Sequence, residues 1–514
     1  MQVGQYSTSA LSARLARMLT LDPGAQIIEF HGNWSTWGQL AATADAVREH
    51  IPGPGTRVGV LLRNSPAHVG LLTGLLLAGA CVVTVNPGRG EDRVRADVAG
   101  LGVPILAGTP ADLTVTNTGQ STAGAGQLLL SVTALGEPVT MAGGDTALGA
   151  GEAAASRPAV AVEMLTSGTT GPPKRVPLGY EMLTRVLLGA KYYEGNSDVT
   201  PRLRTGVAIV NAPLVHLGGL FRVLQCLNDG RPFCLLERFT VHEWADAVRR
   251  HRPRTASLVP AALRMVLDAD VDPGDLSSLR SVISGTAPLS PDAADAFQDR
   301  YGIPVLTSYA ATEFGGGVAG WNLADHQRFW AAKRGSVGRA HPGCELRAVD
   351  AASGEPLPPD AEGLLEVRAE QFDGDGWVRT TDLARIDSDG FVWIVGRADQ
   401  VIIRGGFKVH PDDVRAVLER DPRVRAAAVV GHADPRLGQV PVAAVELRLG
   451  AGPVTAAELR ESASRVLARY ELPAEIRIID ALPRTPSGKA DLTAVRALFA
   501  ETGSAETGFA ETEG

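Results

Sequence analysis

The chain has 514 residues, of which 45% are hydrophobic and 21% are charged, and its formal net charge at pH 7 is −8. These proportions are typical of a soluble globular protein, and a single hydrophobic core rarely serves more than ~250–300 residues, so we expect more than one domain. The negative charge argues against a general nucleic-acid binder or a protein of anionic membrane surfaces.

The N-terminal part of the chain shows no targeting or membrane signal. Residues 1–7 lack a basic region followed by an apolar run, so no signal peptide is expected. The uncharged stretch from Val69 to Val85 is shorter than the ~20 apolar residues of a membrane span, and glycines and Thr73 interrupt it. We expect a buried helix at about 69–79, a buried strand at 81–85 and no integral membrane segment.

Cysteine usage indicates a reducing compartment. The cysteines are few, and they lack the spacing of a metal site or a disulfide framework: Cys81, Cys226, Cys234 and Cys344. A cytoplasmic location fits this pattern.

Short apolar runs alternate with helical patterns and predict parallel sheets covered by helices, which is an α/β fold. The runs are Val58–Leu62, Cys81–Val85, Val207–Val210, Ala256–Val259, Ser281–Ser284 and Val305–Tyr309. The segment from Thr109 to Ala155 is rich in Gly, Ala and Thr and has weak periodicity, so we expect it to be irregular.

A loop of small polar residues lies between these runs: Thr166-Ser167-Gly168-Thr169-Thr170-Gly171-Pro172-Pro173-Lys174. Glycines let backbone N–H groups approach an anion, and the hydroxyls and the Lys174 ammonium group add donors, so the loop suits a polyphosphate. It is not a Walker A loop, because Pro173 stands where that loop needs glycine and Arg175 where it needs Ser or Thr. A glycine-rich surface turn is the alternative interpretation.

Four further motifs contain side chains suited to nucleotide chemistry. They are Tyr309-Ala310-Ala311-Thr312-Glu313, Trp377-Val378-Arg379-Thr380-Thr381-Asp382, Gly396-Arg397-Ala398-Asp399-Gln400-Val401-Ile402-Ile403 and Pro483-Arg484-Thr485-Pro486-Ser487-Gly488-Lys489. Thr312 and Glu313 offer the hard oxygen ligands that Mg²⁺ prefers. Tyr309 ends a predicted strand, where α/β sheets bind their ligands, with core packing as the alternative. Asp382 can accept two hydrogen bonds from a ribose diol, whereas on its own an aspartate in such a turn is more often a helix cap or a turn residue.

Past about residue 396 the pattern changes to that of a small α+β unit. Ala426–Gly431, Val440–Leu447 and Glu475–Ile479 are predicted strands, and Thr455–Tyr470 is a predicted amphipathic helix. The tail from Glu501 repeats Ala, Glu and Thr and cannot bury much surface, so we expect disorder there.

In this order, the loop and the four motifs resemble those of the adenylate-forming superfamily, which contains acyl- and aryl-CoA synthetases, peptide-synthetase adenylation domains and beetle luciferases. The resemblance spans about residues 30 to 495. It implies a large α/β domain with layered sheets and covering helices at 1–396, which binds ATP and the acyl substrate. It also implies a small mobile α+β domain at 397–500 and leaves the tail at 501–514 outside both.

The resemblance assigns the phosphates of ATP to the loop and the first chemical step to Lys489. A carboxylate attacks the α-phosphate, and a lysine between the two anions screens their repulsion as charge develops. Glu313 and Thr166 are implied ligands of Mg²⁺, with Thr312 beside them. The other implied nucleotide ligands are Gly285, Thr286, Ala287, Ser308, Tyr309, Asp382 and Arg397.

Asp399 matches the hinge about which the family's C-terminal domain turns. The turn would withdraw Lys489 and bring Gly405 and Gly406 to the site, where glycines leave room for the pantetheine arm of coenzyme A. The same two glycines would also serve a hairpin turn between strands.

Other positions are less clear or depart from the family pattern. His216 matches a position at the mouth of the acyl pocket, with a core histidine at a strand end as the alternative. Ala310 and Thr381 replace glycines by other small residues, so we expect the nucleotide geometry to survive. Arg175 stands where glycine is frequent, which leaves the mobility of the loop's far end open.

The resemblance implies an ATP-dependent carboxylic acid:CoA ligase that forms an acyl-AMP and pyrophosphate, then an acyl-CoA and AMP, with ATP, Mg²⁺ and coenzyme A as cofactors. One alternative is a stand-alone adenylating enzyme that passes the acyl group to a carrier protein or an amine. Another is a nucleotide-binding protein that has lost catalysis, and a homodimer is left open. Mostly small or apolar residues line the implied acyl pocket, so we expect a hydrophobic aromatic or aliphatic acid: Leu220, Val223, Leu224, 284–287 and 310–317.

Overall fold

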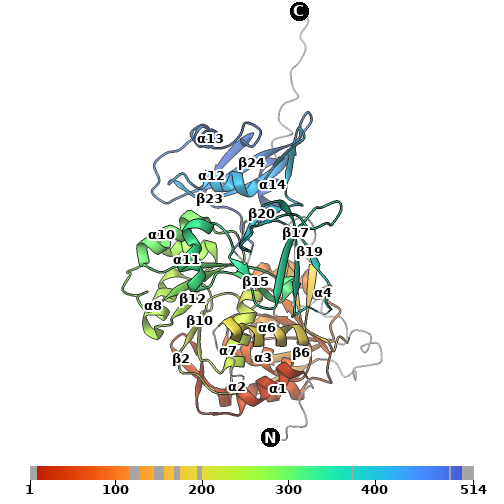
Figure 1. Ribbon diagram of the computed structural model, residues 1–514. Coiled ribbons are helices and arrows are strands. Elements are labelled where there is room, and N and C mark those ends of the chain that lie inside the picture. Colours follow the sequence, from red (N-terminus) through yellow and green to blue (C-terminus); the bar gives the residue numbers. More distant parts are fainter. Residues whose placement is uncertain are drawn as a thin grey trace, which may run out of the picture. The chain divides into compact units, whose positions relative to one another are not determined.

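The structure is a computed structural model that describes residues 9–114, 127–143, 156–166, 174–193, 200–372, 374–485 and 488–500. The chain divides into two compact units. The first unit comprises residues up to 166, 173–345 and 368–376, and the second comprises 346–367 and the chain from 377 onward. Figure 1 shows that both units consist of helices packed on sheets.

A seven-stranded sheet forms the N-terminal part of the first unit. Its five inner strands are parallel and both edge strands are antiparallel to their neighbours. The inner strands are apolar runs because helices cover both faces of the sheet. In sheet order, the strands are β7 (Val139–Ala142), β6 (Leu128–Val132), β5 (Ile105–Gly108), β3 (Arg57–Leu61), β4 (Cys81–Val85), β8 (Val160–Thr166) and β9 (Lys174–Gly179).

Three helices that pack on this sheet begin after a serine or threonine whose hydroxyl caps the helix, namely Ser9, Thr36 and Ser65. The buried α3 (Pro66–Leu77) begins at Ser65, whose hydroxyl caps the helix, and proline occupies its first position. On its face of the sheet lie α1 (Ala10–Leu19), α2 (Trp37–Glu49), α3, α6 (Tyr180–Tyr193) and α7 (Leu217–Asp229). On the other face lies α4 (Glu91–Ala99).

Two smaller sheets complete the first unit. A four-stranded sheet has the order β10 (Ala208–Val210), β11 (Phe233–Leu235), β1 (Gln26–Phe30) and β2 (Asn33–Thr36). A five-stranded sheet has the order β12 (Thr255–Ser257), β13 (Ser281–Ser284), β14 (Val305–Ala311), β15 (Gly316–Gly320) and β16 (Arg339–Ala340). A second apolar core lies between this sheet and the helices α8 (Val241–His251), α9 (Pro260–Asp268) and α10 (Pro291–Tyr301), and Trp330 of α11 (Leu323–Lys333) packs against it.

Two further sheets belong to the second unit, except for residues 344–345 and 368–369, which belong to the first unit. The antiparallel one has the order β17 (Cys344–Val349), β18 (Glu362–Ala369), β19 (Val378–Ile386) and β20 (Val392–Arg397). The other has the order β22 (Phe407–Val409), β21 (Ile402–Arg404), β24 (Gly438–Leu447) and β23 (Val424–Asp434), with β25 (Glu475–Ile479) parallel to β24. Its faces pack on α12 (Pro411–Leu418), α13 (Ala456–Ser464) and α14 (Leu492–Ala500).

The structure confirms the predicted fold class, a large α/β part followed by a smaller α+β part, and it confirms the predicted strands to within a few residues at their ends. Two predictions were wrong. The described part of Thr109–Ala155 is not irregular, since it holds α5 (Pro110–Thr114), β6 and β7, and pairing beside β5 compensates for weak local signals. The helix predicted at Thr455–Tyr470 ends at Ser464, although Leu467 and Tyr470 still pack against the core from the following turns.

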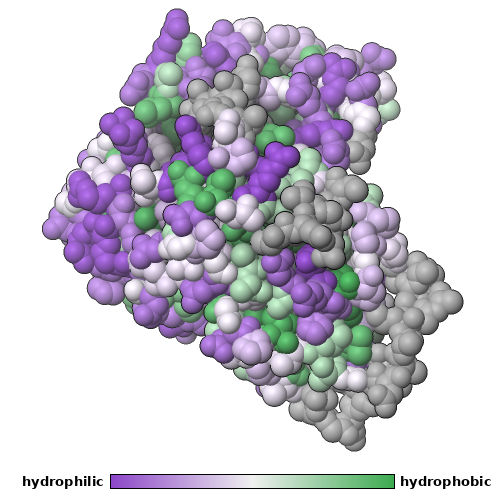
Figure 2. Space-filling model, turned by 90° about the horizontal axis from the view of Figure 1, so that it is seen from below, coloured by the Kyte–Doolittle hydropathy of each residue, from purple (hydrophilic) through white to green (hydrophobic). Residues whose placement is uncertain are grey.

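The surface shows the distribution expected of a globular chain. On the face drawn in Figure 2, hydrophilic residues surround smaller hydrophobic patches. Within the described ranges, no helix combines the length and the apolar character needed to cross a bilayer. The predicted disordered tail from Glu501 lies outside the described residues.

Candidate active site

Strand β14 locates the site, because its second half is not buried although it is the middle strand of a five-stranded sheet. Val305 and Leu306 are buried, whereas every residue from Thr307 to Ala311 is partly exposed. Successive residues of a strand point to opposite faces. The pattern therefore shows open space beside both faces at the carboxyl end of β14, which is where open α/β sheets bind ligands.

The predicted magnesium ligand lies directly after this strand. Thr312 and Glu313 belong to the 3₁₀ turn η4 (Thr312–Phe314), which Gly315 closes at a φ of 69°. Phe314 is buried and anchors the turn, and its ring lies 6.1 Å from that of Tyr309. The Glu313 side chain is exposed. A single exposed carboxylate fits Mg²⁺, which keeps several waters and takes phosphate oxygens as further ligands.

The turn after β13 lies beside β14 and is strained. Thr286 has a φ of 71°, in the left-handed region that a β-branched residue rarely adopts. A Cβ at Gly285 would lie 2.8 Å from Ser308 Oγ and 3.2 Å from the Ser308 carbonyl oxygen, so glycine favours this close packing on β14. Ser284 Oγ is buried and has no hydrogen-bond partner among the described residues. Strain and an unsatisfied buried group in one short turn are typical of a functional site.

His216 precedes the first residue of α7, and its Nε2 atom is buried. The buried Asn64 fixes the segment before it. Asn64 Nδ2 donates to the carbonyls of Ala212 (3.0 Å) and Leu236 (2.9 Å), and Asn64 Oδ1 accepts from the Leu214 N–H (2.7 Å). The sequence predictions did not include Asn64, because nothing in its local pattern reveals partners about 150 residues away.

The predicted phosphate loop closes a hairpin between two strands. Thr166 at the end of β8 pairs with Lys174 at the start of β9. Arg175 Nη1 donates to the Thr84 carbonyl at 3.0 Å, so the far end of the loop is tied to β4. Strand β9 also contacts η4, the turn that contains Glu313. The five residues Ser167, Gly168, Thr169, Thr170 and Gly171 lie outside the described residues, as does the side chain of Thr166.

In the second unit, the two predicted ribose ligands face each other across a pair of strands. Asp382 of β19 pairs with Arg397 of β20. Arg397 Nη2 donates to Thr381 Oγ1 at 2.7 Å, so the threonine that replaces the family's glycine orients the guanidinium group. Arg397 also binds Asp399, the predicted hinge residue. The structure thus brings three predicted residues together, while their roles remain predictions.

Gly405 and Gly406 form the two-residue turn of the hairpin between β21 and β22. Their φ values are 55° and 88°, both in the region that favours glycine in such turns. The hairpin role of the two glycines is therefore confirmed. Phe407, which follows the turn, is 57% exposed and stacks on Tyr470.

Lys489 is exposed and stands at the end of a loop whose base is firmly held. The Thr485 N–H donates to the Lys489 carbonyl at 2.7 Å. Buried Glu446 accepts from the Leu482 N–H (3.0 Å), from Arg484 (3.3 Å) and from Arg425 (2.8 Å). Glu446 is a second residue that the sequence predictions missed, since it reads as an ordinary glutamate in a strand.

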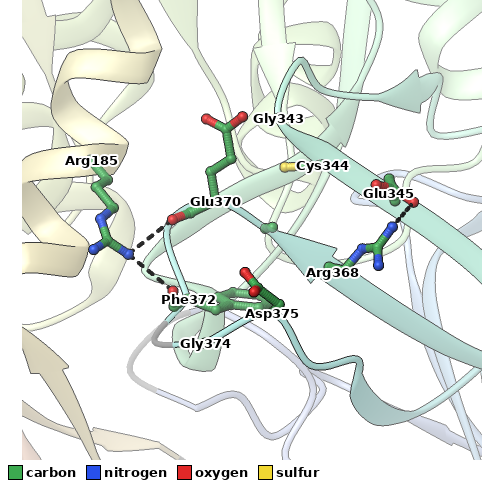
Figure 3. Close-up of a pocket in the computed structure, with 10 residues that line it drawn as sticks. Arg185, Gly343, Cys344, Glu345, Arg368, Glu370, Phe372, Gly374 and Asp375 are labelled. Carbon is green, nitrogen blue, oxygen red and sulfur yellow. Dashed lines mark hydrogen bonds and ion pairs between the residues drawn. The ribbon is translucent and has the colours of Figure 1, made fainter.

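A cavity of about 530 Å³ lies elsewhere in the first unit (Figure 3). Arg185 Nη1 donates to the carbonyls of Glu370 and Phe372 there, and Arg368 pairs with Glu345 at 2.6 Å. None of the predicted site residues lines this cavity. We therefore place the candidate site at the carboxyl end of β14.

Comparisons with known proteins identify the family of the chain. The profile of a family described as "AMP-binding enzyme" matches residues 16–372, and that of an "AMP-binding enzyme C-terminal domain" matches residues 413–489. The chain is 33% identical to indoleacetate–CoA ligase of Aromatoleum aromaticum over 352 residues, which are 65% of this chain and 66% of that protein. It is 28% identical to 4-coumarate–CoA ligase 1 of Oryza sativa subsp. japonica over 459 residues, 84% of this chain and 80% of that protein.

Solved structures share the fold over nearly the whole chain. ATP-bound MatB from Rhodopseudomonas palustris has a TM-score of 0.79 and 24% identity, and covers 95% of this chain and 99% of its own. The amide bond synthetase McbA from Marinactinospora thermotolerans has a TM-score of 0.76 and 26% identity, and covers 95% of this chain and 100% of its own.

Proposed function

Because the chain belongs to the AMP-binding enzyme family, we propose that it is an AMP-forming carboxylic acid:CoA ligase whose adenylation site lies at the carboxyl end of β14. The observation that supports this placement best is the open end of β14 itself. There a tyrosine, a 3₁₀ turn with an exposed glutamate and a strained Thr286 turn lie together in one unit.

In the first half-reaction, a carboxylate oxygen of the acid attacks the α-phosphorus of ATP. The bond to the β-phosphate oxygen breaks, and pyrophosphate leaves. Lys174 and the loop before it bind the leaving phosphates, and the Lys489 ammonium group stabilises the charge that develops between the acid and the α-phosphate. Glu313 would hold Mg²⁺, and the bound ion would neutralise part of the charge on the phosphates.

In the second half-reaction, the thiol of coenzyme A loses its proton to water and its sulfur attacks the acyl carbon. The bond from that carbon to the AMP oxygen breaks, and AMP leaves with the electron pair of this bond. We propose that residues 397–500 move between the two steps about Asp399, so that Lys489 serves the first step and Gly405 and Gly406 the second. The few, scattered cysteines support a cytoplasmic location for this chemistry.

The test is a turnover assay with purified protein, ATP, Mg²⁺ and a panel of aryl and fatty acids, with and without coenzyme A. We expect AMP release that depends on both the acid and coenzyme A, together with a thioester product. Pyrophosphate exchange without a thioester would instead favour a carrier protein or an amine as acceptor. Absence of both signals over the whole panel would contradict the adenylation chemistry.

A further inference from the structure

One face at the end of β14 and β15 consists of small residues. Ser308 pairs with Gly320 and Ala310 pairs with Gly317, and directly paired residues of antiparallel strands share a face. On β15, Gly317 and Gly320 are partly exposed, whereas Gly316, Val318 and Ala319 are buried. The open space beside β15 therefore lies on the face of these two glycines.

His341 occupies this face. Its backbone N–H donates to the Val318 carbonyl at 2.9 Å, which fixes it beside β15. A Cβ at Gly317 would lie 3.2 Å from His341 Cε1, and a Cβ at Gly320 would lie 2.5 Å from His341 Nε2. The imidazole ring thus takes the volume that side chains at both glycine positions would otherwise fill.

The same face continues to the strained turn of the site. A Cβ added at Gly320 would lie 3.5 Å from Ser308 Cβ, and one added at Gly285 would lie 2.8 Å from Ser308 Oγ. His341, the two glycines, Ser308 and the 284–287 turn are therefore contiguous. His341 is the large side chain in an otherwise small-residue surface.

The ring is neutral at physiological pH. Burial lowers the pKa of His341 to about 4, partly offset by the hydrogen bond that the ring donates to the Gly317 backbone carbonyl. A neutral imidazole restricts the size of a bound acid and gives no cationic partner to a second carboxylate.

We propose that His341 is a specificity-determining residue of the acyl pocket. Its ring forms the end wall of the pocket beside Gly317 and Gly320, and this wall restricts the enzyme to short or compact monocarboxylic acids. This inference rests on the proposed function, because it assigns the open face beside β15 to the acyl group. Of the aromatic and aliphatic acids expected from the sequence, it favours compact aromatic and short aliphatic acids and excludes long aliphatic chains.

The size limit gives a measurable expectation. One methylene group too many or too few in such a pocket changes kcat/KM by about 10–200-fold. We expect the wild type to lose activity by about tenfold or more per added carbon once the acid exceeds the pocket. In His341→Ala this limit should move to acids that are longer by about two to four carbons, which is roughly the length of the removed side chain. The KM for ATP should stay within about twofold of the wild-type value.

The experiment measures kcat/KM by AMP release for two graded series, straight-chain acids and ω-phenyl acids, with His341→Ala, His242→Ala and the wild type. His242 lies exposed on α8 and serves as the matched histidine control. Thermal melting in the presence of ATP shows that each variant is folded. An unchanged length limit in folded His341→Ala would overturn the proposal.

A second pair of variants tests the contact itself. Gly320→Ala should impair wild-type turnover because its Cβ meets the His341 ring, and it should be tolerated in the His341→Ala background. Equal effects in both backgrounds would show that His341 and Gly320 are not coupled and would count against the proposal.

Binding separates failure of this inference from failure of the proposed function. Acyl sulfamoyl adenosines of graded chain length are non-reactive mimics of an acyl-AMP, and their effect on the melting temperature needs no turnover. A chain-length limit that moves in His341→Ala would support the role of His341 even if no acid is turned over. A limit that stays in place would overturn it even if the ligase reaction is confirmed.

Discussion

Arg397 holds Asp399 through two hydrogen bonds of 2.9 Å, from Nε to Oδ1 and from Nη2 to Oδ2. Such a bidentate pair fixes the orientation of the guanidinium group. Since Nη2 also donates to Thr381 Oγ1, the predicted ribose ligand and the predicted hinge residue belong to one network. We therefore predict that one side chain, that of Arg397, couples nucleotide binding to the hinge.

Asp399→Ala removes the partner that orients Arg397, so we expect the KM for ATP to rise by about fivefold, and by more in Arg397→Ala, which lacks the donor altogether. Initial rates of pyrophosphate release at varied ATP concentration measure this. Arg465→Ala, whose side chain is 77% exposed, should leave the KM unchanged. An ATP KM that does not change in Asp399→Ala would show that the pair has no part in nucleotide binding.

Lys489→Ala should abolish only the first half-reaction. We expect acyl-AMP formation to fall by about 100-fold or more, because a charge that stabilises the transition state is lost. Thioester formation from preformed acyl-AMP and coenzyme A should stay within about threefold of the wild type. Rapid-quench measurement of each half-reaction separates the two, with Lys333→Ala of the first unit as the control. An equal loss of acyl-AMP formation and thioester formation would contradict the proposal that Lys489 serves only the first half-reaction.

Glu446→Gln should destabilise the second unit. The carboxylate is 3% exposed and binds two arginines that keep about a third of their side chains exposed, 36% for Arg425 and 34% for Arg484. Since water can still solvate the arginines, we expect a loss of about 1–3 kcal/mol, less than for a fully buried pair. Denaturant unfolding measures this loss of stability. The rate of acyl-AMP formation should also fall, because Arg484 lies in the loop that carries Lys489. A stability equal to that of the wild type would show that Glu446 does not anchor the loop.

Thr286→Gly should relieve backbone strain. A β-branched residue at a φ of 71° costs on the order of 1 kcal/mol, so the free energy of unfolding should rise by about that amount. If the strain orients the turn for binding, the KM for ATP or acid should rise at the same time. Higher stability with unchanged kinetics would show that the strained conformation has no function.

The pKa of His341 predicts a specific pH dependence of stability. The ring titrates near 4 in the folded protein, because burial disfavours its charged form, and near 6.5 in the unfolded chain. Between these values the unfolded chain binds a proton that the folded protein does not, so the stability contributed by His341 is complete above pH 6.5 and is lost as the pH falls toward 4. The full loss is on the order of 3 kcal/mol.

Denaturant unfolding of the wild type and His341→Gln at pH 4 to 7 measures this contribution, because other titrating groups cancel in the difference. The free energy of unfolding of the wild type, relative to that of the variant, should fall as the pH is lowered. If the free energies of unfolding of the two proteins change in parallel with pH, the His341 ring has the same pKa in the folded and unfolded states.

Short-range patterns predicted much of this molecule from the sequence. The apolar run Cys81–Val85 forms a buried strand, and the glycine pair at 405 and 406 indicates a hairpin turn. By contrast, β6 and β7 gain their stability from pairing with β5, which local composition does not record. The helix predicted at 455–470 continued the apolar pattern beyond Ser464, where the chain forms turns that still reach the core.

The predicted site residues came from motifs, whereas the supporting residues did not. Asn64, Glu446 and His341 act on segments far from them in the chain or on strands adjacent only in space. Each belongs to a common residue type without a distinctive neighbourhood. Their roles become visible only when the three-dimensional contacts are known.

The packing of His341 on two glycines also constrains how the sequence can change. A side chain gained at Gly320 would collide with the ring and one gained at Gly317 would crowd it, while loss of the ring alone would leave unfilled space beside β15. Positions 317, 320 and 341 are therefore epistatic, since each tolerates a new residue only in the context of the others. A change of substrate range through this face should occur by paired substitutions, and relatives with a side chain at 317 or 320 should carry a smaller residue at 341.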